Sequence, residues 1–386
     1  MTRTQDVIII GGGISGVAAA YELARRGAAV TLVEKGELAS MASGWTLGGV
    51  RQSGRHPAEL PLAQAAVRRW EVLSEELGAD VEYRQQGNLR LARTPQEADA
   101  MSAMVEEQRT LGLDLTFLPD TQSVREVAPA LSEHVLAASF CPTDGHANPT
   151  ATVRAFADAA ARHGATIITG TGVDRIVTDD RRVIGVETNA GPLAAGVVVV
   201  AAGIYSDRLC ATAGVPLPLH HIHVSAVQTV PLPPMLGQVL GVANADFAGR
   251  QEADGRLRMT ISTGDWHHPA GPLAPDEIQP PAYMVSTIIE RGAYVLPAVR
   301  EARINRVWGG LLDMTPDGLP VIERTPGVEG LVVAAGFSGH GFCLGPITGQ
   351  LIAALVTEAT PCCPLDPFRL ARFATVETDA SPELLG

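Results

Sequence analysis

The chain has 386 residues, of which 46% are hydrophobic and 18% charged, and it carries a formal net charge of −13 at pH 7. This length can bury a large core and suggests two domains, whereas the acidic balance offers no basic surface for nucleic acid, which we do not expect as a partner. The sequence has no apolar run of about eighteen residues, no signal-peptide pattern and no CxxC pair, which favours a cytoplasmic protein without a membrane span.

The start of the chain alternates between strand and helix patterns. Residues 6–10 form a short apolar run, residues 11–13 are glycines, and residues 14–26 have a helical pattern rich in Ala and Leu. Residues 29–33 then form a second apolar strand that ends at Glu34. This order predicts a βαβ unit, which implies a parallel sheet.

The turn between the first strand and the helix contains the pattern GxGxxG at Gly11, Gly13 and Gly16. The first glycine permits a tight turn, the second lets the backbone approach a pyrophosphate, and the third allows the helix to pack closely on the strand. Glu34 lies 21 residues beyond Gly13, where a carboxylate accepts hydrogen bonds from ribose hydroxyls and disfavours a 2′-phosphate. The sequence therefore predicts a dinucleotide site at this helix N-terminus, with Ile14 and Ser15 beside the phosphates.

Further helices are predicted at residues 65–79 and 97–111. An α/β pattern then returns, with a helix at 153–163 and strands at 166–169 and 196–202.

The later part of the chain changes in character and then returns to the α/β pattern. Residues 219–305 are rich in Pro and His and contain the alternating strands 224–230 and 257–262. An apolar strand at 331–335 and a helix at 348–357 follow.

The distribution of these elements favours FAD over NAD as the dinucleotide. A nicotinamide dehydrogenase usually completes its nucleotide domain in one stretch, but here the α/β pattern returns twice, far downstream. The strand at 331–335 ends in the glycine-rich turn 336–342, and the helix that we expect from about Pro346 directs its N-terminus toward polar atoms. Such a terminus suits an isoalloxazine ring, which gains negative charge at its N1–O2 edge on reduction.

We therefore expect an α/β fold with a Rossmann-like FAD-binding domain and an interleaved, mainly antiparallel β-sheet (α+β) substrate domain. The expected segments are 1–80, 143–218 and 303–386 for the FAD-binding domain, and 81–142 and 219–302 for the substrate domain.

The chain resembles the D-amino-acid oxidase superfamily of FAD-dependent oxidoreductases, near the sarcosine oxidase, glycine oxidase and D-hydroxyproline dehydrogenase branch. The segments that carry the likeness are 11–16 with Glu34 and Lys35, 43–51, 144–149, 200–203, 308–310 with 315–317, and 336–342. The resemblance implies hydride transfer to flavin from a carbon beside an amine. The further cofactor contacts that we expect are Lys35, Ser43, Gly48, Gly49, Val173, Ala202, Gly203, Gly310, Gly336, Gly339, His340, Gly341 and Phe342.

Three residues are candidates for work on the substrate. Arg51 lies in a segment that resembles the family's flavin-facing loop, and a guanidinium suits bidentate recognition of a carboxylate. The alternative for Arg51 is an exposed surface arginine. Arg250, in the expected substrate domain, is a weaker second clamp. His340 lies in a turn that resembles the sarcosine oxidase turn at the flavin, where it either holds or deprotonates an amine or shapes the turn.

The chain departs from two patterns of the family. Gly310 stands where monomeric sarcosine oxidase has its flavin-bound cysteine, so we expect non-covalent FAD, and Cys343 stands where that enzyme has a carboxylate-binding lysine. The arginines of the glycine oxidase pattern are also missing from segments 310–313 and 341–342. We therefore expect a substrate that differs from those of both enzymes.

Two other groups of residues have competing interpretations. A histidine group (His220, His221, His223, His267 and His268) suggests a metal, but no carboxylate or cysteine lies at ligand spacing, and we expect no metal. The adjacent Cys362 and Cys363 are either redox-active or part of a surface turn, and the turn is favoured.

The sequence thus predicts an FAD-dependent amino-acid or amine oxidase or dehydrogenase, which oxidises the C–N bond of a D-amino acid, an N-alkyl glycine or an imino acid. One alternative is an FAD-dependent 2-hydroxy-acid oxidase or dehydrogenase. Another is the flavin-binding subunit of a multi-subunit electron-transfer dehydrogenase, in which case the chain is part of a hetero-oligomer. The expected electron acceptor is O₂ or an acceptor protein.

Overall fold

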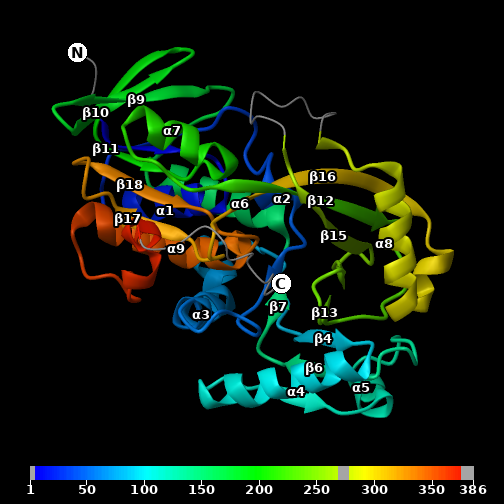
Figure 1. Cartoon of the computed structure of the whole chain (residues 1–386). Coiled ribbons are helices and arrows are strands. Elements are labelled where there is room, and N and C mark those ends of the chain that lie inside the picture. The colour runs from blue at the N-terminus through cyan, green and yellow to red at the C-terminus, as the bar shows by residue number, and fades with distance from the viewer. Residues whose placement is uncertain (1–4, 268–277, 375–386) are drawn as a thin grey trace.

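The computed structural model describes residues 5–267 and 278–374. Within these ranges the strands form two eight-stranded sheets and one two-stranded sheet. The first large sheet lies at the upper left of Figure 1, and the second extends over the right and lower parts of the molecule.

The first sheet begins with the predicted βαβ unit. Its main path has the order β17-β18-β11-β1-β2-β8, and an antiparallel extension runs from β11 through β10 to β9. Strand β1 is parallel to both β2 and β11, and β11 is parallel to β18. The strands are β1 (Gln5–Ile10), β2 (Val30–Val33), β8 (Thr166–Ile168), β9 (Val173–Asp179), β10 (Arg182–Thr188), β11 (Gly191–Val200), β17 (Val321–Arg324) and β18 (Leu331–Ala335).

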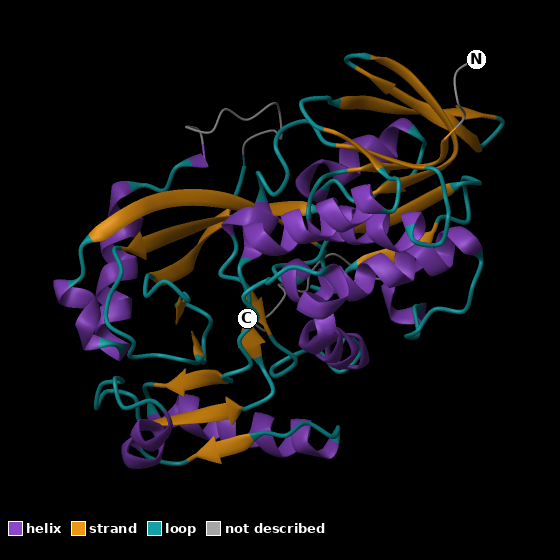
Figure 2. Cartoon of the chain, turned by 180° about the vertical axis from the view of Figure 1, so that it is seen from behind, coloured by secondary structure: helices purple, strands orange, loops and turns teal. Residues whose placement is uncertain are grey.

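Helices cover this sheet, and Figure 2 shows them as a layer along it. The helices of this part are α1 (Ile14–Ala24), α3 (Leu60–Leu77), α6 (Pro149–Arg162), α7 (Ser206–Thr212) and α9 (Gly341–Thr357). Helix α1 is buried along its whole length and packs against α6 and α9. The contact with α9 requires glycine, because a Cβ at Gly349 would lie 2.6 Å from Cβ of Ala18.

The second sheet has the order β16-β12-β15-β14-β13-β4-β6-β5. Its described pairs are antiparallel except for β13 and β4, which run parallel. The strands are β4 (Asn88–Ala92), β5 (Thr116–Leu118), β6 (Ala137–Cys141), β12 (His220–Thr229), β13 (Val239–Val242), β14 (Ala248–Gln251), β15 (Leu257–Asp265) and β16 (Ile304–Met314). The helices beside it are α4 (Pro95–Thr110), α5 (Thr121–Val127) and α8 (Ala282–Val295).

A short segment connects the two large sheets. Helix α2 (Ala42–Trp45) leads into β3 (Gly49–Val50), which pairs with β7 (Gly145–His146). The chain then passes through residues 51–59 into α3. These residues place the candidate Arg51 between the two sheets.

The structure confirms the expected fold class and corrects several element boundaries. Helix α9 begins at Gly341 rather than near residue 348, because Pro346 lies inside the helix instead of marking its start. Strand β16 lies in the sequence segment that we assigned to the FAD-binding domain. It pairs with β12 in the second sheet, where His220 is opposite Met314 and Gln228 is opposite Arg306.

Candidate active site

The glycine loop between β1 and α1 has the close packing that its spacing predicts. Gly11 has a φ of +113°, and a Cβ at this position would clash with the carbonyl oxygen of Ala201. A Cβ at Gly16 would clash with the carbonyl oxygen of Gly11. Gly13 instead faces a cavity, and the nearest atom to a Cβ there is Oγ of Ser43, at 3.1 Å. This glycine leaves room for a ligand rather than for a neighbouring chain segment.

Ser43 and Glu34 organise the same loop from two sides. The amide of Ile14, at the start of α1, donates a hydrogen bond to Oγ of Ser43 at 3.0 Å. The carboxylate of Glu34 accepts hydrogen bonds from the amides of Gly12, at 2.6 Å, and Gly36, at 2.8 Å. The acid at the end of β2 is therefore held against the glycine loop, with its remaining lone pairs available to a ligand.

A cavity, which we call the cofactor cavity, lies beside this loop and is lined by Glu34 and Lys35 as well as by the turn at Gly339. It contains about 430 Å³ of space that the centre of a water molecule can occupy. The expected cofactor contacts that line it are Gly11, Gly13, Ile14, Ser15, Glu34, Lys35, Ser43, Val173, Ala202, Gly203, Gly339, Gly341 and Phe342. Further lining residues, which sequence reasoning missed, include Thr171, Gly172, Asp174, Tyr205, Arg208 and Asp313.

Near Glu34, the side chains of Lys35 and Tyr205 line the cofactor cavity and contact each other. Nζ of Lys35 lies 3.4 Å from the ring centroid of Tyr205, which is a cation–π contact. The hydroxyl of Tyr205 is buried and makes no hydrogen bond within the described residues. A buried hydroxyl without a partner is costly in a protein interior, so this atom fits a site that a polar ligand completes.

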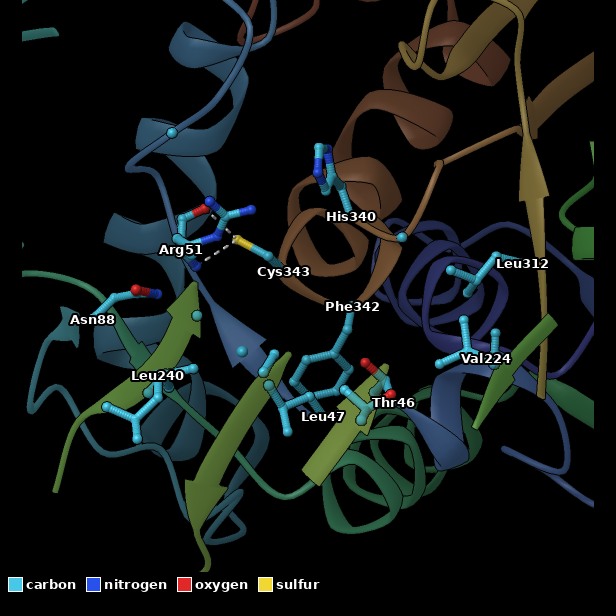
Figure 3. A pocket seen from close by; sticks show the side chains of 18 of the residues that line it. Thr46, Leu47, Arg51, Asn88, Val224, Leu240, Leu312, His340, Phe342 and Cys343 are labelled. Carbon is cyan, nitrogen blue, oxygen red and sulfur yellow. Dashed lines mark hydrogen bonds between the residues drawn. The ribbon is translucent and has the colours of Figure 1, made fainter. Parts of the chain in front are cut away.

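A second cavity, which we call the substrate cavity, adjoins the first. It contains about 250 Å³ of the same kind of space. The residues that line both cavities are Ala42, Thr46, Leu311, Leu312, Gly339 and Phe342. In Figure 3, Arg51 and Asn88 lie on one side of this cavity, and Leu312 and Val224 lie on the other. The polar side chains of Arg51 and Asn88 thus lie opposite Leu312, which is one of the residues shared by the two cavities.

Three arginines line the substrate cavity. Arg51 follows β3, Arg55 lies in the loop before α3, and Arg90 lies in β4 of the second sheet. Nη1 of Arg51 donates to the carbonyl oxygen of Ser53 at 2.7 Å, and Nε of Arg55 donates to the carbonyl oxygen of Arg51 at 3.0 Å. Burial, together with the charges of Arg55 and Arg90, lowers the pKa of Arg51 to about 9. The three guanidinium groups therefore repel one another in a partly dehydrated space.

Two carboxylates lie behind these arginines. Both oxygens of Asp144 are occupied by the loop that follows Arg51: they accept from the amide of Gln52 at 2.8 Å, and from the amide and hydroxyl of Ser53. Oε2 of Glu59 lies 3.4 Å from Nη1 of Arg55. Neither acid lines the cavity. Through these contacts, Asp144 and Glu59 stabilise the loop of residues 51–55 without facing the cavity.

His340 lies at the N-terminus of α9 and lines the substrate cavity. Its Nδ1 is 2.8 Å from Oε2 of Glu59. Burial alone would raise the pKa of the Glu59 carboxyl. The neighbouring His340 and Arg55 outweigh this effect and lower the pKa to about 2. Burial, followed by the charge of Arg55, lowers the pKa of His340 below its usual value. In Figure 3 the His340 ring points away from the ring of Phe342.

Some expected site residues do not line either cavity. Arg250 is 3% exposed, and its guanidinium donates to the carbonyl oxygens of Leu47 and Ala147 and to Nδ1 of His146. These contacts favour a structural role for Arg250 over the expected substrate clamp. Three of the expected glycines, Gly16, Gly48 and Gly336, also lie outside both cavities.

Three of the expected cofactor contacts, Gly49, Gly310 and His340, line only the substrate cavity. Gly49 lies in β3, and Gly310 lies in β16 beside Trp45. A Cβ at Gly310 would lie 3.0 Å from the Trp45 ring.

The substrate cavity contains functional candidates that the sequence analysis did not name. Arg55 follows Arg51 by four residues, so the same loop could have indicated it. Arg90 carries no such signal, because it comes from a distant strand whose place beside the loop depends on the fold.

The histidines and paired cysteines have separate surroundings. His223 is buried, and its ring nitrogens contact Oγ1 of Thr263 at 2.9 Å and the carbonyl oxygen of Ile278 at 2.8 Å. Among the residues that the structure describes, no group of three or more His, Cys, Asp or Glu could hold a metal ion. His268 lies outside the described residues. Cys362 is exposed and Cys363 is buried, both as free thiols.

Comparison with known proteins decides the family. A model of the family described as "FAD dependent oxidoreductase" matches residues 6–355. The chain belongs to this family of FAD-dependent oxidoreductases. The chain is accordingly an oxidoreductase that uses FAD, and the cofactor cavity is the candidate site for it. The Gly11–Gly16 loop, Glu34 and the unpartnered hydroxyl of Tyr205 fit that cofactor.

Individual members of the family align with almost the whole chain. A glycine oxidase from Geobacillus kaustophilus is 31% identical over 383 residues, covering 96% of this chain and 98% of the relative. A sarcosine oxidase subunit beta from an Arthrobacter species is 30% identical, covering 97% of this chain and 92% of the relative. The crystal structure of L-proline dehydrogenase from P. horikoshii superposes with a TM-score of 0.88 at 29% identity, covering 97% of this chain and 99% of that one.

None of the helices that the structure describes is both long enough and apolar enough to cross a bilayer.

Proposed function

We propose that this FAD-dependent oxidoreductase oxidises the C–N bond of an amino acid or secondary amine. The observation that carries the proposal is the position of Arg51, which lines a cavity that shares Gly339, Leu312 and Phe342 with the FAD site. When bound, FAD supplies the acceptor for a hydride from the carbon beside the amine. The names of the glycine oxidase and sarcosine oxidase relatives support an amino-acid or amine substrate.

Arg51 is the proposed clamp for the carboxylate of the substrate. Its position between the two sheets is held by the hydrogen bond to Ser53 and by the loop contacts of Asp144. A guanidinium held in this way loses little further freedom on binding, and its planar donors match a carboxylate. Orienting the substrate against the shared residues of the two cavities is then the main contribution of Arg51.

His340 is the proposed acceptor of the amine proton. Its lowered pKa keeps the imidazole neutral near pH 7, as a base requires. Nδ1 lies 2.8 Å from the Glu59 carboxylate, although the contact lacks the angles of a hydrogen bond, and we propose Nε2 as the ring nitrogen that accepts the proton. Glu59, whose pKa is about 2, stays ionised and stabilises the imidazolium that forms.

The test is anaerobic bleaching of the yellow flavin against a panel of D-amino acids, N-alkyl glycines and imino acids, with 2-hydroxy acids of the same carbon skeleton beside them. Bleaching by at least one amine, and not by its hydroxy counterpart, is the expected result. Bleaching by the hydroxy acids alone would overturn the proposal.

A second proposal concerns a partner subunit. The relatives include a sarcosine oxidase subunit beta and the hydrogen cyanide synthase subunit HcnC, whose names state that they are subunits. We propose that this chain is likewise a subunit of a multi-subunit enzyme and passes electrons to another chain of that enzyme. Co-purification of a stoichiometric partner with the tagged chain from its native cell supports this, whereas full turnover of the isolated chain with O₂ contradicts it.

A further inference from the structure

One row of paired residues crosses the second sheet along the substrate cavity. Residues that lie directly opposite each other on neighbouring strands point to the same face of a sheet. Such a row passes through β16, β12, β15, β14, β13, β4 and β6, and its members are Trp308, Ala226, Thr260, Ala248, Gly241, Arg90 and Ser139. All of them line the substrate cavity, and none of them lines the cofactor cavity. The row is therefore a wall of the substrate cavity alone.

The middle of this row consists of small residues, which we call the small-residue floor: Ala226, Thr260, Ala248 and Gly241. Neighbouring strands lie about 4.8 Å apart, so the floor extends over roughly 14 Å. An ideal Cβ built on Gly241 would meet no atom within 4 Å, and the φ of Gly241 is not left-handed. Neither the backbone nor close packing therefore requires glycine at this position, and its effect is to leave space in the cavity.

The small-residue floor offers a ligand mostly carbon atoms. Its one hydroxyl, on Thr260, donates a hydrogen bond to the carbonyl oxygen of Ser225 at 3.0 Å. Val224 and Val239 also line the cavity, and each lies two residues from a member of the floor on the same strand, so they extend its apolar face. In Figure 3, Leu47 and Val224 lie across the cavity from His340.

The floor begins beside the proposed carboxylate clamp. Gly241 lies opposite Arg90 of the neighbouring strand. An ideal Cβ built on Gly54 would lie 2.8 Å from Nη1 of Arg90 and 2.9 Å from Nη1 of Arg51. The side chain of Arg90 therefore reaches from the strand beside Gly241 to the loop of Arg51. A carboxylate held by Arg51 leaves the rest of a substrate within reach of the floor.

The size of the cavity exceeds what a glycine-sized molecule fills. Its space for water-sized probes is about 250 Å³, whereas one water needs roughly 10–15 Å³ of such space. Water against a carbon-lined wall finds few hydrogen-bond partners there. An apolar group that displaces this water gains free energy.

We propose that the substrate carries an apolar side chain or N-substituent larger than a methyl group, which lies on the small-residue floor, and that Gly241 determines this specificity by keeping the floor open. This inference rests on the proposed function and narrows its substrate class. A side chain at position 241 would project over the floor, next to the clamp, and would shorten the space for the substituent.

The test compares acetate with hexanoate as probes of the FAD-loaded protein, by titration of the flavin absorbance spectrum. The two probes carry the same charge and differ only in the length of the alkyl chain. Each buried methylene strengthens binding by roughly fourfold, so we expect hexanoate to bind at least about tenfold more tightly. In Gly241→Val this preference should fall to about threefold or less, while the affinity for acetate stays within about twofold of its original value.

Gly196→Val is the matched control. Gly196 lies in β11, outside both cavities, and it likewise has no left-handed φ and no atom within 4 Å of an ideal Cβ. This variant should retain the full preference for hexanoate. Gly241→Ala fills less of the floor, should lose part of the preference, and serves if Gly241→Val loses its FAD.

The outcomes separate this inference from the proposed function. Equal binding of acetate and hexanoate overturns the apolar-substituent proposal and leaves a carboxylate site intact. An unchanged preference in the FAD-loaded Gly241 variant, or an equal loss of preference in Gly196→Val, also overturns it. If neither probe perturbs the flavin spectrum, there is no carboxylate site beside FAD, which counts against the proposed function itself.

Discussion

Nδ1 of His146 lies 2.9 Å from Nη1 of Arg250, deep between the two large sheets. A guanidinium only donates, so Nδ1 must accept, and the ring must carry its hydrogen on Nε2. Protonation of His146 would remove the acceptor and place two cations in contact. Burial, followed by the charges of Arg250 and Arg84, accordingly lowers the pKa of His146 to about 3.

The first prediction concerns stability at acidic pH. The unfolded chain binds a proton at His146 below about pH 6.5, whereas the folded chain does so only near pH 3. The folded state therefore loses roughly 1.4 kcal/mol of stability per pH unit through this residue as the pH falls from 6.5 toward 3. His146→Asn retains an acceptor for Arg250 and should show a correspondingly shallower decline between pH 6 and 4 in urea unfolding. Parallel pH profiles for the two proteins would contradict this assignment.

The second prediction concerns Glu34. The variant Glu34→Ala loses the ribose contacts and also the hydrogen bonds to the amides of Gly12 and Gly36. A charge-assisted hydrogen bond contributes about 1.5–3 kcal/mol, so the dissociation constant of FAD should rise about tenfold or more. Titration of the apoprotein by quenching of flavin fluorescence measures it. The exposed Glu37 gives the control Glu37→Ala, and an unchanged constant for Glu34→Ala would mean that this acid does not contact the ribose.

The third prediction concerns Arg51. Arg51→Ala should lower kcat/KM for a carboxylate substrate by about tenfold to a hundredfold, because one charge-assisted contact is lost. FAD content should be unchanged, since the contacts of Cys343 are to the backbone of Arg51. Arg51→Lys should recover activity only in part, because an ammonium group cannot make the planar two-bond contact. Loss of flavin in Arg51→Ala would show that the residue is structural.

The fourth prediction is that FAD is held without a covalent bond. Gly310 offers no thiol, and burial raises the pKa of the nearby Cys343 thiol, which keeps it a poor nucleophile. Precipitation with acid should release all of the flavin into the supernatant. Yellow colour that stays with the washed precipitate would contradict the prediction.

The fifth prediction concerns oxygen. A lysine beside the flavin can stabilise developing superoxide, but the single lysine of this chain, Lys35, lies over the ring of Tyr205 in the cofactor cavity. We therefore expect substrate-reduced enzyme to react slowly with O₂ and faster with an artificial acceptor. Stopped-flow mixing of the reduced enzyme with air-saturated buffer measures this rate. Reoxidation as fast as turnover would instead indicate an oxidase, with the positive charges of Arg51 and Arg55 in the substrate cavity as the candidate substitute.

The geometry of the candidate FAD site was largely predictable from the sequence. The glycine loop and Glu34 lie within one βαβ unit, whose geometry follows from short-range rules about turns, helix termini and strand pairing. Their hydrogen bonds and close approaches agree with the spacing. The start of α9 was less predictable, because Pro346 in the sequence suggested a helix boundary that the packing of this helix against α1 overrides.

The sequence by itself determined the nucleotide-binding unit, since its function depends on residues that are close along the chain. Only the tertiary structure decided the composition of the substrate cavity. Arg90 comes from β4 and meets Arg51 over Gly54 because the second sheet packs beside the loop after β3. Arg250, which equally suited a clamp by residue type, is instead buried and bonded to His146 and Ala147. Long-range packing determines which guanidinium groups face a ligand, and no local pattern encodes it.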